Sequence, residues 1–305
     1  MKIAIVSDVH LKLRRDKDFE LSRFNLLIQN LKQSPSDIII FNGDLLDNAR
    51  PTLEEIKAIS NALVELKDKC VYIIGGNHEA VTKVRSTYDY LPLNVCRSNK
   101  VHKLIIEGIT LHLVHWDSIH KIHLIENSDV LISHYRSKVE GLYNEEVDTS
   151  FVNNFKLILL GDIHSRYSPA TNVFYTGTPY DIAYTKSKEP NGYVMLNVAN
   201  GEYDWHYVDL DLPKKVRIDV SVGNYKDLKL NAEYLYKIHV TGTLDALKGI
   251  EAPRNVTIVK HIEDVSVVKI QTKDVDFFDS LASKVDEMMT TKTSKTKSVL
   301  LKIKG

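Results

Sequence analysis

Short apolar runs rich in β-branched residues recur through the first 200 residues, and helical patterns separate them. Because these runs are short and apolar at consecutive positions, they are typical of strands buried on both faces of a sheet. The alternation of strand and helix predicts an α/β core in which helices cover the sheets. The predicted strands are Ile3–Val6, Ile38–Phe41, Val71–Ile74, Leu111–Val114, Val130–Ile132, Leu157–Leu160, Val173–Tyr175 and Tyr193–Val198.

Two amphipathic segments lie between the first three of these strands. Apolar residues at helical spacing predict helices around residues 24–31 and 53–66. Thr52 and Glu55 have the spacing of a capping box, which indicates where the second helix begins. These helices are expected to cover one face of a sheet.

The pattern changes after about residue 210, where apolar and polar residues alternate as they do in half-exposed strands. Such strands are predicted at Val216–Val222, Leu235–Thr243, Val256–Glu263 and Val265–Thr272, followed by a helix whose apolar face carries Phe278, Leu281, Val285 and Met288. The sequence therefore predicts two domains, an α/β domain at residues 1–210 and a small α+β capping domain at residues 211–305.

Charge and cysteine content limit the class of protein. The 40 basic and 40 acidic residues give a formal net charge of zero, so any contact with nucleic acid must come from local clusters. One basic cluster, at residues 12–17, is interpreted either as a rim that attracts phosphate or as a solvated loop. Two cysteines form no disulfide framework, which favours a reducing cytoplasm. The N-terminal residues are expected to form a strand rather than a signal peptide, and no apolar run is long enough to span a membrane.

Polar residues follow five of the predicted strands directly. The carboxyl ends of strands are the edge at which open α/β sheets bind ligands, so these residues are expected to meet in one site. Glycines at 43, 75, 76 and 161 are expected to let the chain turn sharply there. The five blocks are Ser7-Asp8-Val9-His10, Asn42-Gly43-Asp44-Leu45-Leu46-Asp47, Gly75-Gly76-Asn77-His78-Glu79, Ser133-His134 and Gly161-Asp162-Ile163-His164.

The blocks supply oxygen and nitrogen ligands without sulfur. Seven such groups are too many for one tetrahedral ion and suit two divalent ions that share a carboxylate; Mn²⁺ fits the oxygen-rich set best, with Mg²⁺, Fe and Zn²⁺ as alternatives. Two ions about 3.5–4 Å apart can clamp a phosphoryl group for in-line attack. His78 is the remaining histidine, suited to assist the leaving oxygen. The candidate ligands are Asp8, His10, Asp44, Asn77, His134, Asp162 and His164.

These five blocks resemble the signature of the calcineurin-like metallophosphoesterases. Within that superfamily the chain is most similar to the SbcD-type nuclease subunits of double-strand-break repair, including those that phages encode for recombination. The features that favour this branch are the turn Tyr175-Thr-Gly-Thr-Pro179, the strand that begins Gly192-Tyr-Val and the expected cap. The resemblance implies a two-sheet α/β sandwich flanked by helices.

The resemblance also implies a role for each site residue. Asp8, His10 and His164 would bind the first metal, Asp44 would bridge, and Asn77 and His134 would bind the second. His78 would be the catalytic histidine, oriented by the Asp47 carboxylate. Asp162 stands where the family has histidine; as a third carboxylate ligand it would lower the positive charge of the site, which predicts a preference for Mn²⁺ and activity that rises at alkaline pH.

The implied activity is that of a 3′→5′ exonuclease on duplex ends and an endonuclease on single strands. The assembly that the resemblance implies is a homodimer bound to an SMC-like coiled-coil P-loop ATPase. This chain has no Walker motif, so any ATP dependence would come from that partner. The location would be the cytoplasm, of the host cell if a phage encodes the chain. Two alternatives stay open. One is a small-molecule phosphodiesterase or phosphoprotein phosphatase, although the phosphatase motif is not continued because Asn48 and Ala49 follow Asp47. The other is a non-catalytic scaffold that binds DNA ends, which the replacement at Asp162 would allow.

Overall fold

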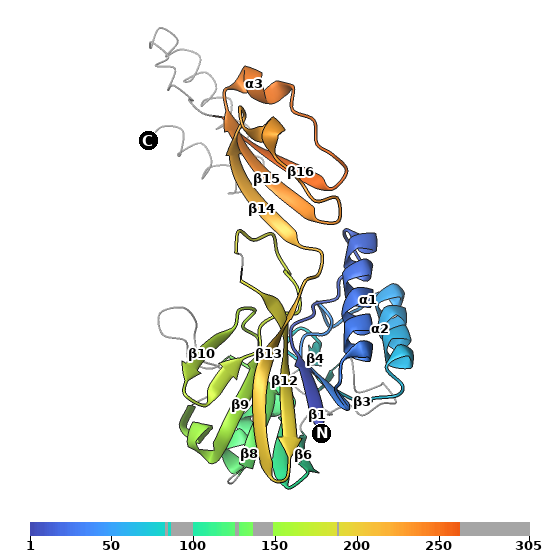
Figure 1. Cartoon of the computed structure of the whole chain (residues 1–305), viewed down its shortest axis with the longest axis vertical. Coiled ribbons are helices and arrows are strands. Elements are labelled where there is room, and N and C mark those ends of the chain that lie inside the picture. Colours follow the sequence, from blue (N-terminus) through green and yellow to red (C-terminus); the bar gives the residue numbers. More distant parts are fainter. Residues whose placement is uncertain (83–84, 87–99, 126–127, 137–148, 188, 263–305) are drawn as a thin grey trace, which may run out of the picture. The chain divides into compact units, whose positions relative to one another are not determined.

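The computed structural model describes residues 1–82, 85–86, 100–125, 128–136, 149–187 and 189–262 (Figure 1). The chain divides into two compact units. The first contains Met1–Val240 and Glu251–Val259, and the second contains Thr241–Ile250 and the residues from Lys260 onward. The first unit carries two large sheets and two long helices, and all the candidate site residues lie in it.

The first sheet has five strands in the order β13-β12-β1-β2-β3. Its centre is parallel, because β1 pairs with β2 and β2 with β3 in the same direction, whereas β12 runs antiparallel to β1 and β13 antiparallel to β12. The bounds are β1 Lys2–Val6, β2 Ile38–Asn42, β3 Cys70–Ile74, β12 Asn191–Ala199 and β13 Glu202–Leu210.

The second sheet has six strands in the order β10-β11-β9-β8-β7-β6, and β7, β8, β9 and β11 are mutually parallel. A separate two-stranded sheet joins β4 to β5. The bounds are β4 Ala80–Thr82, β5 Arg85–Ser86, β6 Val101–Ile106, β7 Ile109–Val114, β8 Ser128–His134, β9 Phe155–Gly161, β10 Tyr167–Ala170 and β11 Val173–Tyr175.

The two sheets pack face to face through a shared apolar core. Ile3 and Ile5 of β1 lie in one cluster with Val130 and Ile132 of β8, whereas Ala4 of β1 faces the other way. Side chains alternate between the faces of a strand, so β1 contributes to the core on both of its sides. The other face of the first sheet is covered by α1 (Lys17–Gln33) and α2 (Leu53–Glu65). The predicted α/β sandwich with flanking helices is confirmed.

The capping box predicted for the second helix is present. The Glu55 backbone N donates to Thr52 Oγ1 at 3.2 Å, and the Thr52 backbone N donates to the Glu55 carboxylate at 2.6 Å. That carboxylate also accepts from the Leu13 backbone N at 2.8 Å. The cap therefore ties the loop that follows β1, which carries site residues, to the start of α2.

Five strands are additional to the sequence prediction, namely β4, β5, β6, β10 and β13. The β12–β13 hairpin turns at Asn200 and Gly201, which have φ of 54° and 79°. The β6–β7 hairpin turns at Glu107 and Gly108, with φ of 48° and 87°. Positive φ at both turn residues is the requirement of a tight two-residue hairpin, for which Asn-Gly is a strong sequence signal.

A three-stranded sheet follows in the order β14-β15-β16, with bounds Lys215–Ser221, Leu235–Gly242 and Val256–Ile262. These strands match three of the four predicted after residue 210. The short helix α3 spans Leu244–Lys248. The predicted strand Val265–Thr272 and the helix around Phe278–Met288 lie outside the described residues, and the domain boundary after residue 210 stays a prediction. Among the described helices, none combines the length and apolar character that crossing a membrane requires.

Candidate metal centre

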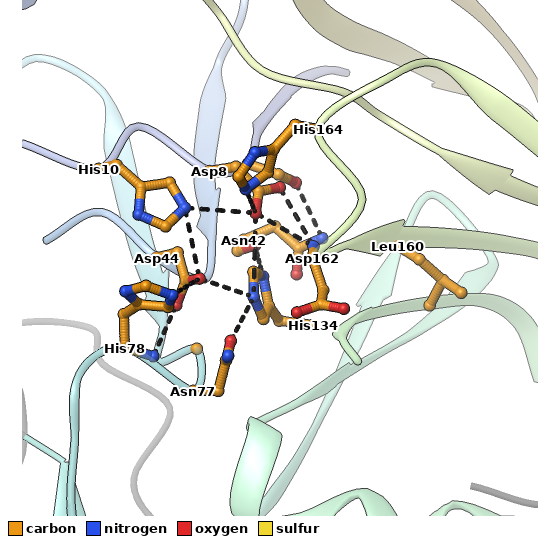
Figure 2. A network of polar contacts seen from close by, with 12 residues as sticks. Asp8, His10, Asn42, Asp44, Asn77, His78, His134, Leu160, Asp162 and His164 are labelled. Carbon is orange, nitrogen blue, oxygen red and sulfur yellow. Dashed lines mark hydrogen bonds and ion pairs between the residues drawn. The ribbon is translucent and has the colours of Figure 1, made fainter. Parts of the chain in front are cut away.

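Loops at the carboxyl ends of β1, β2, β3, β8 and β9 bring the predicted site residues together (Figure 2). Their side chains form three overlapping groups whose candidate ligand atoms lie within 4.8 Å of one another. Asp8, His10 and Asp44 each belong to two of these groups, so the groups form one continuous cluster. The groups are Asp8 with His10 and His164, His10 with Asp44 and His78, and Asp8 with Asp44 and His134.

The backbone at the cluster is held in an unusual conformation. Asp8, His10, Asp44 and Asp162 have φ of 56°, 48°, 49° and 86°. Residues other than glycine seldom adopt positive φ, and such strain gathers at functional sites where surrounding contacts enforce it. Here those contacts include the hydrogen bond from the Asp8 backbone N to the Gly43 carbonyl at 3.1 Å and the one from His10 to the Asp44 carbonyl at 2.8 Å.

Glycines make room for the ligands rather than serving only as turns. A Cβ on Gly76 would lie 2.1 Å from Asp44 Oδ1, and one on Gly161 would lie 2.4 Å from His134 Nδ1. Gly43 combines a φ of 80° with the same crowding, since its Cβ would lie 2.2 Å from the His134 ring. The sharp turn expected from sequence therefore applies to Gly43, whereas Gly76 and Gly161 are required by close packing.

The Asp44 carboxylate lies at the centre of the cluster. Its Oδ2 is 3.3 Å from His134 Nε2, 3.5 Å from His10 Nε2 and 3.9 Å from His78 Nε2. Burial alone would raise the pKa of Asp44, but His134, His10 and His78 outweigh it and hold the pKa below its ordinary value. Asp44 belongs to two of the three candidate groups, so its role as a carboxylate shared between two ions stays a prediction.

Asp8 is the second buried carboxylate, on the side of the cluster that faces His164. Its Oδ1 lies 3.8 Å from His164 Nε2 and 3.9 Å from His10 Nε2. Burial is the main reason that the pKa of Asp8 is raised well above its ordinary value, and the neighbouring Asp44 adds to the effect. A cation beside Asp8 would reverse this, because it would favour the ionised carboxylate.

His10 supplies the observation that tests whether the cluster fits a metal. Its Nε2 is buried and has no hydrogen-bond partner, and it points between the Asp8 and Asp44 carboxylates. A buried polar nitrogen without a partner is costly, and coordination to a cation at this position would satisfy it. The oxygen and nitrogen donors are those that Mn²⁺, Mg²⁺ and Zn²⁺ accept, so the residues present fit divalent ions.

His134 is oriented by the main chain of the other sheet. Its Nδ1 donates to the Asn42 carbonyl at 2.9 Å, which leaves Nε2 facing Asn77 Oδ1 at 3.1 Å. In a metal-binding histidine, a hydrogen bond made by the ring nitrogen that does not bind the metal fixes the orientation of the ring. Burial acts to lower the pKa of His134, but Asp44 and Asp8 outweigh it and raise the pKa well above its ordinary value. The structure thus brings His134 and Asn77 together, as predicted for one metal position.

Glu79 is a site residue to which the sequence analysis assigned no role. Its buried carboxylate accepts backbone N–H groups from Gly76 and Leu46 at 2.7 Å and from Asp44 at 3.1 Å. It therefore joins the loop after β3 to the loop after β2 and holds Asp44 in place. Burial, with the charge of Asp44, raises the pKa of Glu79 to about 7. The available signal was its position next to His78 in the third block.

His78 lies at the outer side of the cluster, with 42% of its side-chain surface exposed. Its Nδ1 donates to the Asp47 backbone carbonyl at 2.7 Å, not to the Asp47 carboxylate as expected from sequence. That carboxylate instead contacts Lys12 Nζ at 2.5 Å and lies 3.6 Å from His10 Nδ1. Asp47 therefore orients His78 through its main chain, while its carboxylate lies beside His10.

Asp162 and His164 come from the loop after β9. His164 Nε2 faces Asp8, and burial, together with the neighbouring His10, lowers the pKa of His164 to about 4. Asp162 contributes its backbone N, which donates to the Asp8 carboxylate at 3.1 Å. The Asp162 carboxylate pairs with Arg136, and among the described residues it belongs to none of the candidate metal groups. Metal binding by Asp162 stays a prediction.

The basic segment after β1 is largely engaged within the chain. Lys12 pairs with Asp47, Lys17 pairs with Glu54 at 2.5 Å, and Arg14 donates to the Arg50 carbonyl at 2.8 Å. These contacts tie the segment to the loop after β2 and to the start of α2, and the choice between a rim that attracts phosphate and a solvated loop stays open.

Comparisons with known proteins agree with the motifs at this site. A family model described as calcineurin-like phosphoesterase matches residues 1–166. The chain is 28% identical over 274 residues to the probable exonuclease subunit 1 of Escherichia phage T5, an alignment that covers 82% of each chain. It is 21% identical to an SbcCD nuclease subunit of Staphylococcus saprophyticus, over 97% of this chain and 96% of the relative. It is also 21% identical to the DNA double-strand break repair protein Mre11 of Methanocaldococcus jannaschii, over 93% of this chain and 81% of the relative.

The match to the family model extends from β1 through the loop after β9. It therefore contains all nine site residues predicted from the five blocks. The predicted similarity to SbcD-type nuclease subunits is confirmed, because the relatives include such a subunit and a phage exonuclease subunit. With its two-sheet sandwich and its cluster of carboxylates and histidines, this chain belongs to the calcineurin-like phosphoesterase family.

Proposed function

We propose that this protein is a metal-dependent DNA nuclease that hydrolyses phosphodiester bonds at a centre of two divalent ions. The observation that carries the proposal is the buried Asp44 carboxylate, which lies within 4 Å of three histidines, beside the Asp8 carboxylate and the unpartnered Nε2 of His10. Mn²⁺ is the favoured ion and Mg²⁺ the alternative, because carboxylate and amide oxygens such as those of Asp8, Asp44 and Asn77 suit these ions.

The ligands divide between two positions. Asp8, His10 and His164 would hold one ion, Asn77 and His134 the other, and Asp44 would contact both. Two bound ions would supply an activated water and neutralise charge on the phosphoryl oxygens. Asp8, Asp44 and His134 form the buried part of the cluster, so their packing would limit where the ions lie.

His78 would assist the departing oxygen. With Nδ1 donating to the Asp47 carbonyl, the Nε2 of a protonated ring can donate a proton to a substrate oxygen. Its partial exposure gives substrate access to that nitrogen. His78 also belongs to a candidate metal group with His10 and Asp44, so a metal count on a variant separates the two roles.

The biological setting proposed is DNA repair or recombination. The relatives carry the names of exonuclease, SbcCD and Mre11 proteins and align over most of this chain, which supports a DNA substrate. We extend this to 3′→5′ exonuclease activity on duplex ends and endonuclease activity on single strands. The assembly would be a homodimer with a coiled-coil P-loop ATPase, located in the cytoplasm, of the host cell if a phage encodes the chain.

The test compares substrates for the full-length protein with Mn²⁺. Linear duplex DNA and circular single-stranded DNA should be hydrolysed, and Asp44→Asn should abolish both activities. If the protein hydrolyses only a cyclic nucleotide or a phosphopeptide, it is a small-molecule phosphodiesterase or a phosphoprotein phosphatase and not a nuclease. Binding of DNA ends without hydrolysis would indicate a scaffold. Affinity capture should recover a P-loop ATPase that changes the nuclease rate.

A further inference from the structure

A belt of buried polar residues lies next to the metal centre, where the apolar core between the two sheets ends. On β2 the side chain of Ile40 packs in that core, and Asn42 is the next residue on the same face of the strand. The residues of this polar belt are all fully buried, and each lies at or directly after the end of a strand. They are Ser7, Asn42, Ser133 and Thr176.

Hydrogen bonds within the polar belt join the two sheets. Asn42 Nδ2 donates to the Ser133 carbonyl of β8 at 3.0 Å and to Ser7 Oγ, directly after β1, at 3.2 Å. Ser7 Oγ also accepts from Thr176 Oγ1, directly after β11 of the second sheet, at 2.6 Å. The Asn42 main chain makes a further link, since its carbonyl accepts from His134 Nδ1 at 2.9 Å (Figure 2). Asn42 therefore contacts β8 through both its side chain and its main chain.

The polar belt is adjacent in sequence to the buried ligands. Ser7 precedes Asp8, Ser133 precedes His134, and only Gly43 separates Asn42 from Asp44. Asp8 and Asp44 come from the first sheet and His134 from the second, and the three form one candidate metal group. A shift of one sheet against the other would therefore change the distances between these ligands.

Stability does not explain an asparagine at this position. Asn42 Oδ1 is buried and has no hydrogen-bond partner among the described residues, and an unsatisfied buried acceptor costs free energy. An apolar side chain would continue the row of Ile40 without that cost. The amide instead adds hydrogen bonds of defined length and direction between the sheets, whereas apolar contacts are non-directional.

We propose that Asn42 is a positioning residue, which fixes the separation of the two sheets at the metal centre and thereby the distance between the two metal positions. This rests on the proposed nuclease function and adds a residue that acts through Asp8, Asp44 and His134. Two ions clamp a phosphoryl group only at a separation of about 3.5–4 Å. A change in their spacing therefore slows the chemical step more than it weakens substrate binding.

The first readout is the binding of Mn²⁺ to the full-length protein, which needs no catalysis. In calorimetric titration, Asn42→Ala should bind one of the two ions about 10–100-fold more weakly than the wild type, as expected when an outer contact of a metal-binding histidine is disturbed. At saturating Mn²⁺, electron paramagnetic resonance should show a changed exchange coupling between the two ions, because this coupling depends on their separation.

Ile40→Ala is the matched control, because Ile40 is equally buried on the same face of β2. It should lower the urea midpoint of unfolding at least as much as Asn42→Ala, since it leaves a cavity in the core. Its Mn²⁺ affinities and exchange coupling should stay at wild-type values. A single Mn²⁺ ion in the wild type, unchanged binding and coupling in Asn42→Ala, or equal losses in Ile40→Ala would overturn the proposal.

Thr176→Val keeps the test decisive if circular dichroism shows that Asn42→Ala does not fold. This change preserves the shape of the side chain and removes the hydroxyl that donates to Ser7. The exchange coupling of Thr176→Val should also differ from that of the wild type. An unchanged coupling would then overturn the proposal.

The second readout is the rate of DNA hydrolysis with Mn²⁺. For Asn42→Ala, kcat should fall about 10–100-fold at unchanged KM, because the substrate still binds but the ions are misplaced. A raised KM at unchanged kcat would overturn the proposal. If the wild type binds two coupled Mn²⁺ ions but hydrolyses no DNA, the proposed nuclease function fails instead. The Mn²⁺ affinity and the exchange coupling of Asn42→Ala then still decide the role of Asn42.

Discussion

The two sheets build the metal centre in different ways. The first sheet positions Asp8, His10 and Asp44 through the backbone, with positive φ at each and with Glu79 holding the Asp44 loop. In the second sheet the site residues are held through their own side chains, since the His134 ring donates to the Asn42 carbonyl and the Asp162 carboxylate pairs with Arg136, although Asp162 also has a positive φ. Backbone geometry thus fixes Asp8, His10 and Asp44, whereas the side chains of His134 and Asp162 depend on the partners that hold them.

The largest loss of DNA hydrolysis is expected in the first sheet, from Asp44→Asn. The change keeps the size of the side chain but removes the charge that lies among three histidines. We expect DNA hydrolysis to fall by about 10⁴-fold or more and at least one Mn²⁺ ion to be lost, because Asp44 would contact both ions. Rate assays and metal analysis on the same preparation check this. If Asp44→Asn still binds two ions, Asp44 does not bridge them.

The next variant, His78→Ala, separates proton transfer from metal binding in the first sheet. His78→Ala should lower DNA hydrolysis by about 10²–10⁴-fold, the range of a general acid, while both ions stay bound. His120→Ala, which removes an exposed histidine outside the cluster, serves as the control and should keep wild-type activity. Loss of one ion from His78→Ala would reassign His78 as a ligand.

A smaller effect is expected from the close packing between the sheets. In Gly161→Ala, the new Cβ would lie 2.4 Å from His134 Nδ1 and 2.8 Å from the Asn42 carbonyl oxygen, so His134 must move. We expect about 10–100-fold weaker Mn²⁺ binding, as follows from disturbing the partner of a metal-binding histidine. Gly223→Ala, whose Cβ would meet no atom within 4 Å, is the matched control. Equal Mn²⁺ affinity for both variants would show that His134 does not depend on this packing.

The smallest effect concerns a buried histidine of the second sheet outside the centre. Burial, with the charge of Lys103, lowers the pKa of His112, whose Nδ1 contacts Ser128 Oγ at 2.8 Å. The unfolded chain therefore binds a proton near pH 6.5 that the folded chain binds only at lower pH, so His112 reduces stability as pH falls through this window. His112→Asn should flatten that decline by less than about 1 kcal/mol. Denaturant unfolding at pH 7.5 and 5.5 measures it, and an unchanged slope would contradict the assignment.

Much of the fold and of the cluster follows from the sequence, because short apolar runs predict strands and the residues after them share one edge. Asn200-Gly201 is a strong signal for a hairpin turn. The strand after it, β13, is half exposed, and its mixed apolar and polar pattern does not identify it as a strand. The side-chain partners were not readable. Spacing does not show that Asp47 turns its carboxylate toward His10, nor that Arg136 lies opposite Asp162, since these contacts join loops distant in sequence.

Calorimetric titration of the full-length protein with Mn²⁺ measures directly whether the two sheets together hold two ions. We expect two ions per chain for the wild type. For His134→Ala we expect one, because Asp8 and His10 of the first sheet, with His164, remain for the other position. One ion in the wild type, or two in a folded His134→Ala variant, would contradict a centre shared between the sheets.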